Sequence, residues 1–217
     1  SLGLVGSEMC IRDRFVEIYR QMEDFLLRVE HVSKHYSGHT ALDDVSLDIP
    51  RGSVYGLLGP NGAGKTTTLH TVTGLISPKS GQVLFEGKDI TRLKQSQLKE
   101  IYGDIQMVFQ NPVGSFDPRR TLGDGIGESL RNRGMKKADV EKRVAELLEQ
   151  CGLEKEYAKR YPYEVSGGQC QRAAIARALA VEPKVLICDE ATSALDVTIQ
   201  KQIMELLEDL KEKNGLS

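Results

Sequence analysis

Apolar and polar positions along the chain predict strands in the first half and helices in the second. Five runs of strand length are apolar or alternate apolar with polar residues, and turn residues separate them. The predicted strands are residues 25–32, 45–49, 53–58, 82–87 and 105–109. A polar turn is predicted at 33–40 and a helix at 65–75, directly after the third strand.

From residue 121 to 161 the pattern becomes helical and contains no strand candidate. One apolar helix face is defined by the spacing of Val140, Val144, Leu147, Leu148 and Cys151. Residues 185–188 (VLIC) then predict a buried strand, and apolar residues at helical spacing between 199 and 210 predict a last amphipathic helix. Strands with crossover helices, interrupted by an all-helical insertion, predict an α/β core with a helical lobe.

Composition and charge limit the classes of function that the chain could have. Of the 217 residues, 40% are hydrophobic and 28% are charged, as in an ordinary soluble protein. The net charge of −2 gives no support to nucleic-acid binding, which normally shows as a basic excess. No apolar run approaches the roughly 18–20 residues that cross a bilayer, so we expect any membrane role to act through a partner. The four cysteines, Cys10, Cys151, Cys170 and Cys188, show no metal-ligand spacing and are predicted to be reduced cytosolic thiols.

The two ends of the chain are expected to be atypical. Residues 1–24 are predicted to be a leader that is in part non-native, because VGSEMCIRDR is similar to translated sequencing-adapter read-through. The end at NGLS brings no change of composition, which predicts a C-terminally truncated domain over 25–217.

A glycine-rich turn lies between the strand predicted at 53–58 and the following helix. It satisfies the phosphate-loop pattern GxxxxGK[ST] and consists of Gly59, Pro60, Asn61, Gly62, Ala63, Gly64, Lys65 and Thr66, with Thr67 next. Glycines let consecutive backbone N–H groups point at a phosphate, and the helix adds the positive end of its dipole. Lys65 is predicted to reach the β- and γ-phosphate oxygens, and the Thr66 hydroxyl to ligate Mg²⁺. The sequence therefore predicts a site for a nucleotide phosphate and Mg²⁺.

An acidic pair follows the strand at 185–188. Asp189 is placed to hold the Mg²⁺ shell, and Glu190 to polarise a water molecule that attacks the γ-phosphate.

A second glycine turn begins at Ser166. A serine followed by two glycines caps a helix N-terminus and leaves amides unpaired for an anion. The string Val165-Ser166-Gly167-Gly168-Gln169, followed by Gln171-Arg172 and an alanine-rich helix, resembles the signature of the ATP-binding cassette (ABC) ATPases. The order of elements resembles theirs over residues 25–217: phosphate loop, Gln110 after a strand, helical lobe, signature, acidic strand, and Ser193-Ala194-Leu195-Asp196.

This resemblance implies a P-loop NTPase (RecA-like) α/β core with an N-terminal antiparallel β subdomain and an inserted α-helical subdomain. It divides the domain into a β subdomain and core at 25–110, a helical subdomain at about 111–165, and a core continuation at 166–217.

In these ATPases two cassettes pack head to tail. The resemblance then implies that the 166–169 turn, through Ser166 and Gly168, contacts ATP held by the partner, and that Asp196 couples the two sites. It also implies that Tyr36 stacks on adenine and that Gln110 contacts Mg²⁺ and the attacking water. The four histidines, His31, His35, His39 and His70, match no catalytic role.

The stretches FQNPVGSFDPRRT, YPYEVSGGQCQR and CDEATSALDVTIQ look like the oligopeptide, dipeptide and nickel importer ATPases in particular. That resemblance implies transmembrane permease subunits as partners, a solute-binding protein as an indirect one, no nucleic acid, and a peripheral place on the cytoplasmic face of the membrane. Val165 stands where Leu or Phe is commoner, and the family's switch-loop His would follow residue 217. Two alternatives stay open: a non-transport ABC ATPase, and a truncated ATP-binding module without turnover.

Overall fold

The computed structural model describes residues 25–189 and 197–214. They form two compact units, one ending at Leu93 and one beginning at Lys94. None of the helices in these residues combines the length and the apolarity needed to cross a membrane.

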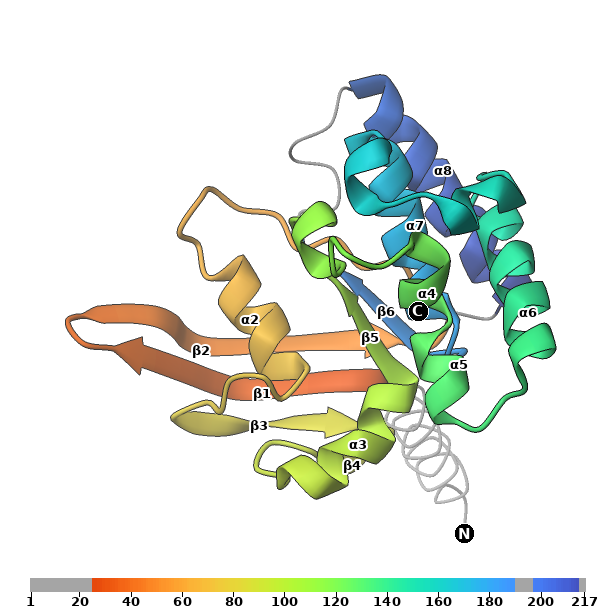
Figure 1. Cartoon of the computed structure of the whole chain (residues 1–217). Helices are drawn as coiled ribbons and strands as arrows, with labels where there is room; N and C mark the ends of the chain where they lie inside the picture. Colours follow the sequence, from red (N-terminus) through yellow and green to blue (C-terminus); the bar gives the residue numbers. More distant parts are fainter. Residues whose placement is uncertain (1–24, 190–196, 215–217) are drawn as a thin grey trace, which may run out of the picture. The chain divides into compact units, whose positions relative to one another are not determined.

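The N-terminal unit is built on a four-stranded sheet in the order β2-β1-β3-β4 (Figure 1). The strands are β1 (Phe25–Tyr36), β2 (His39–Pro50), β3 (Ser80–Phe85) and β4 (Lys88–Asp89), and every neighbouring pair is antiparallel. Leu27, Val29 and Val83 are buried on this sheet, and α2 (Lys65–Val72) packs beside β2. An antiparallel β unit was expected here and is confirmed.

The turn predicted at 33–40 is confined to residues 37–38, and the rest of the stretch is paired strand, so the predicted extent was wrong. β1 continues to Tyr36, which pairs with His39 across a turn of only two residues. The side chains of this hairpin end are largely exposed, and exposed strand residues can be polar on both faces. Hydropathy therefore gave no strand signal although the backbone is paired.

The strand predicted at 53–58 is not formed, and this prediction is corrected. The sheet of the N-terminal unit does not include the segment, and the side chains of Val54, Tyr55 and Leu58 are 56%, 51% and 93% exposed. An apolar run becomes a strand only where a partner strand accepts its backbone hydrogen bonds. The helix predicted at 65–75 ends earlier, at Val72, because Gly74 adopts a left-handed φ of 73° that terminates it.

The C-terminal unit combines a two-stranded parallel sheet with helices. Its strands are β5 (Ile105–Val108) and β6 (Val185–Cys188). Its helices are α3 (Gln95–Asp104), α4 (Leu122–Ile126), α5 (Glu128–Asn132), α6 (Lys137–Gln150), α7 (Gly167–Leu179) and α8 (Val197–Asn214), with 3-10 turns η1 (Val113–Ser115), η2 (Lys155–Lys159) and η3 (Pro162–Glu164). The predicted strandless region from 121 to 161 is confirmed.

One apolar cluster holds this unit together. The apolar face predicted for α6 is buried in it, from Val140 to Cys151, and the alanine-rich side of α7 packs there as well. The small alanines let α7, which is capped by Ser166, pack closely against its neighbours.

Candidate functional site

The phosphate-loop segment leads into α2 through a glycine that no other residue could replace without strain. Gly64 is the N-cap of α2 and has a left-handed φ of 83°. A Cβ atom at this position would lie 2.4 Å from the carbonyl oxygen of Ala41 and 2.9 Å from Cδ2 of Leu42, both in β2. The bare glycine therefore lets the start of α2 approach the sheet closely.

Lys65 folds back over the loop that precedes it. Its Nζ donates to the carbonyl oxygens of Gly59, at 2.5 Å, and Pro60, at 3.1 Å. The amide of Ala63 also donates to the Pro60 carbonyl, at 3.1 Å, which closes the turn. The first turn of α2 carries no acidic side chain, so nothing there competes with an anion for the ammonium group or for the helix dipole.

Tyr36 lies in the same unit, at the end of β1. Tyr36 is 48% exposed, and the Lys34 ammonium lies 5.5 Å from the centroid of its ring. The hairpin that carries Tyr36 continues into Ala41, whose carbonyl faces Gly64. An exposed aromatic ring on such a hairpin can stack on a flat ligand.

In the C-terminal unit the parallel pairing of β5 with β6 brings two predicted residues to one sheet edge. Val108 pairs with Cys188, so Gln110 and Asp189 both follow the carboxyl ends of adjacent strands. Asp189 is 4% exposed, and its amide donates to the Val108 carbonyl at 3.0 Å. The third predicted Mg²⁺ ligand, Thr66, belongs to the N-terminal unit. Glu190 and Asp196 lie outside the described residues.

The second glycine turn is a capped helix start, as the sequence predicts. Ser166 Oγ accepts from the amide of Gln169 at 3.3 Å, and Gln169 Oε1 accepts from the amide of Ser166 at 2.9 Å. This reciprocal pair is a capping box. Within the described part of the chain, the amides of Gly167 and Gly168 have no acceptor. A helix start with unpaired amides attracts an anion.

Two interactions of α7 are not predicted by the sequence. Gln169 Nε2 donates to the hydroxyl of Tyr157 in η2, at 2.8 Å. Farther along, Arg177 donates to the carbonyl oxygen of Ser115 at 2.5 Å and to its Oγ at 3.1 Å, and its guanidinium lies 4.4 Å from the Phe116 ring centroid. Arg177 thereby ties α7 to the segment that follows Gln110. Neither pairing has a local sequence signal, since the partners are 12 and 62 residues apart.

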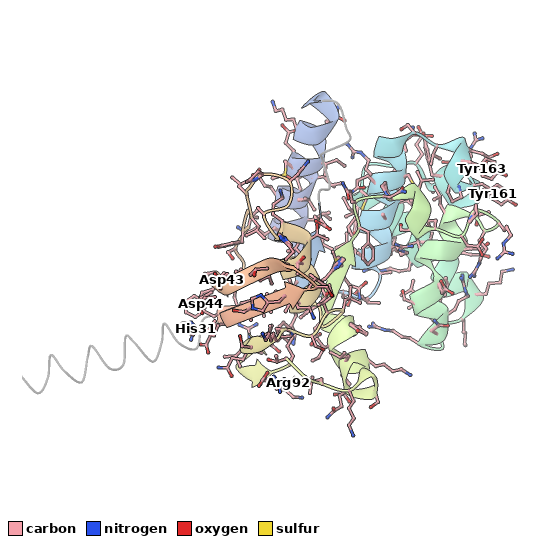
Figure 2. The ribbon with its side chains drawn as sticks, turned by 90° about the vertical axis from the view of Figure 1, so that its left-hand side faces the viewer. His31, Asp43, Asp44, Arg92, Tyr161 and Tyr163 are labelled. Carbon is pink, nitrogen blue, oxygen red and sulfur yellow. The ribbon has the colours of Figure 1, made fainter. Side chains whose placement is uncertain are left out.

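The other reactive side chains make ordinary structural contacts. Burial raises the pKa of the Cys151 thiol to about 12 and that of Cys170 to about 11, so both stay protonated. Figure 2 shows His31 beside Asp44 on the antiparallel sheet, and its Nδ1 lies 2.9 Å from Asp44 Oδ1. Among residues 25–189 and 197–214, no group of three or more His, Cys, Asp or Glu side chains could hold a metal ion.

Comparison with known proteins identifies the family. A family model described as ABC transporter matches residues 42–193, and the chain belongs to this family. The resemblance to the ABC ATPases is thereby confirmed, and the solved structures confirm the P-loop NTPase fold class. The oligopeptide transport ATP-binding protein OppF of Bacillus subtilis is 43% identical over 203 residues, which cover 90% of this chain and 67% of that protein.

Two further proteins extend the comparison. The oligopeptide transport ATP-binding protein OppD of Mycobacterium bovis is 48% identical over 177 residues, covering 82% of this chain but 29% of that protein. The chain thus spans less than a third of that relative. A solved dimer of the ATP-binding cassette MJ0796, bound to ADP and Pi, is 34% identical with a TM-score of 0.79, and the match covers 87% of this chain and 84% of that one.

Proposed function

We propose that this chain is the ATP-binding and ATP-hydrolysing subunit of an ABC importer of the peptide or nickel type. It would act as a peripheral protein at the cytoplasmic face of the membrane and couple hydrolysis to solute passage through separate permease subunits. A solute-binding protein would act as an indirect partner. The names of the two oligopeptide transport relatives favour short peptides as the solute.

One observation carries the proposal: the chain has two helix N-termini suited to binding a phosphate, and only one of them has a cationic side chain in its first turn. α2 begins at a left-handed glycine and carries Lys65. α7 is capped by Ser166 and offers the amides of Gly167 and Gly168, with no cation in its first turn. The second start would serve the nucleotide of another copy. The solved cassette MJ0796, which is a dimer bound to ADP and Pi, is consistent with such an arrangement.

The chemical types of the predicted site residues suit MgATP. The residues of the phosphate loop would wrap the β-phosphate with Lys65 on its oxygens, and Tyr36 would stack on the adenine. Oxygen ligands from Thr66, Gln110 and Asp189 suit Mg²⁺, which supplies charge neutralisation at the phosphate oxygens.

The remaining roles concern the attacking water and the partner copy. Glu190 would orient the water, and Ser166 with its glycines would stabilise charge on the partner's γ-phosphate. Asp196 would couple the two sites across the dimer.

The test is complementation between two inactive variants of the complete subunit. Lys65→Ala removes the phosphate loop's cation, and Ser166→Arg blocks the capped helix start, so each variant alone should lose MgATP hydrolysis. In a mixture, half of the dimers combine one chain of each kind and contain one intact shared site. We expect hydrolysis to return to about one quarter of the unmodified rate.

Two controls define the outcome. Each variant mixed with more of itself should stay inactive at the same total concentration. If the mixture also stays inactive while size-exclusion chromatography shows mixed dimers, the proposal of a site shared between two copies is wrong.

A further inference from the structure

The helix start at Ser166 is held by a chain of three hydrogen bonds that ends at Tyr157. The Tyr157 hydroxyl accepts from Gln169 Nε2 at 2.8 Å, and Gln169 Oε1 accepts from the amide of Ser166 at 2.9 Å. The amide of Gln169 in turn donates to Ser166 Oγ at 3.3 Å. Thus the side chain of Gln169 bridges a tyrosine of η2 and the cap of α7.

This arrangement decides which way the Gln169 carboxamide faces. The two ends of a carboxamide differ, since the oxygen accepts and the NH₂ group donates. If the group turned over, its NH₂ would face the N–H of Ser166, donor against donor, and half of the capping box would be lost. The Ser166 N–H, which can only donate, therefore selects the orientation in which Oε1 faces it, and the Tyr157 hydroxyl anchors that orientation by accepting from Nε2.

The same arrangement leaves Ser166 ready to donate. Its Oγ already accepts from the Gln169 amide, so the hydroxyl hydrogen remains for another acceptor. The amides of Gly167 and Gly168 follow it in the same turn. A fixed cap thus presents a hydroxyl donor and two backbone donors together.

Tyr157 is itself well placed to act as a brace. Its amide donates to the Glu154 carbonyl at 3.0 Å, and its carbonyl accepts from the Arg160 amide at 3.1 Å. Its ring packs against the apolar cluster of the C-terminal unit, and its bond to Gln169 is partly buried. A partly buried bond meets less competition from water than an exposed one.

We propose that Tyr157 is a positioning residue that acts through Gln169 to hold the Ser166 turn ready for the partner's γ-phosphate. The inference rests on the proposed function. Without the hydroxyl, part of the energy of dimer formation would go into ordering the cap, so ATP-driven dimerisation should weaken. Nucleotide binding to a single chain should not change, because the phosphate loop belongs to the N-terminal unit.

The experiment uses the complete subunit with Glu190→Gln, which is expected to bind ATP and stay dimeric. Adding Tyr157→Phe removes one oxygen atom and keeps the ring. Because each dimer contains two Ser166 turns, the variant loses two net hydrogen bonds per dimer. We therefore expect the dimer dissociation constant, measured with MgATP by analytical ultracentrifugation, to rise about five- to a hundredfold. Affinity for MgADP, measured by titration calorimetry on the monomer, should be unchanged.

Tyr163→Phe is the matched control. Tyr163 lies in η3, its residue is 69% exposed, and its ring stacks on Tyr161 at a centroid distance of 5.5 Å (Figure 2). The same loss of an oxygen there should leave the dimer constant unchanged. A double-mutant cycle tests whether Tyr157 acts through Gln169. In a chain that already carries Gln169→Ala, Tyr157→Phe should cause no further change in the dimer dissociation constant.

The outcomes separate this inference from the proposed function. If the Glu190→Gln parent stays monomeric with MgATP, the proposed function is wrong and this inference goes with it. If the parent dimerises and Tyr157→Phe leaves its constant unchanged, this inference alone is overturned. A fall in thermal stability without a change in dimerisation would likewise overturn it, since it assigns Tyr157 a purely structural role.

Discussion

Replacing Gly64 with alanine tests whether the start of α2 depends on its close approach to β2. The substitution adds a single methyl group, and two separate costs follow from the geometry. The first is conformational, because Gly64 has a φ of 83°, where a residue with a Cβ atom is disfavoured by about 1–2 kcal/mol. The second is steric, because the new atom would lie 2.4 Å from the Ala41 carbonyl oxygen.

The steric cost can be bounded. The obstructing atom belongs to the backbone of a strand paired with β1, so it cannot swing away as a flexible side chain would. Forcing a methyl group into such a packed place typically costs about 1–3 kcal/mol. The two terms together predict a loss of about 2–5 kcal/mol in the stability of the N-terminal unit.

Gly62 supplies the matched control within the same loop. Its φ is 84°, almost equal to that of Gly64, but a Cβ atom there would meet nothing within 4 Å. Gly62→Ala should therefore show the conformational cost alone, about 1–2 kcal/mol. The difference between the two variants isolates the contact with β2.

The assay combines urea unfolding, followed by circular dichroism, with amide hydrogen exchange at residues 65–72. Exchange reports the local opening of α2 even if the two units unfold separately. Equal effects of the two substitutions on stability and exchange would refute the steric argument.

Three further predictions concern the C-terminal unit. Arg177→Met removes the donors to Ser115 and should lower the free energy of unfolding in urea by about 2–4 kcal/mol, since the guanidinium is charged and partly buried. Arg177→Lys should have an intermediate stability. A lysine variant as stable as the original would show that the two-pronged geometry of the guanidinium is unimportant. Cys151 and Cys170, whose pKa values burial raises to about 12 and 11, should resist alkylation at pH 8 in the folded protein when followed by peptide mass mapping. Because the folded state holds these protons more tightly than the unfolded state, each thiol should also lower stability as pH rises above about 9, by about 1 kcal/mol at pH 10; rapid labelling or flat stability between pH 8 and 10 would contradict this.

The elements that sequence predicts well are those whose signal is contained in the element. The face of α6 from Val140 to Cys151 can be read from spacing alone, because one helix determines which side chains share a side. The segment 53–58 shows the opposite case. Its apolar run is real, but whether a run pairs depends on strands elsewhere in the fold.

The same distinction holds for the candidate site. The left-handed Gly64 and the cap at Ser166 were predictable because each turn is a short sequence with a fixed local geometry. The bond from Gln169 to Tyr157 was not, since it depends on how η2 packs beside the start of α7. Local motifs thus predicted where the donors are, and only the packing shows what holds them in place.

The two helix starts differ in their side chains, and the difference fits the separate roles proposed for them. The first turn of α2 contributes a cation of its own, and Lys65 can reach back over the loop as far as the Gly59 carbonyl. The first turn of α7 contributes only small residues and a glutamine already engaged in the cap. Two glycines in succession let a phosphate held elsewhere come close to the backbone, which a larger side chain would prevent. Neither first turn contains a carboxylate, and those of α3 and α8 contain none either. By contrast, the first turns of α4, α5 and α6 contain Asp124, Glu128 and Asp139, which lie at the positive end of each helix dipole. These differences support the proposal that the start of α2 binds a phosphate of its own chain's nucleotide and that the start of α7 completes a site in another copy.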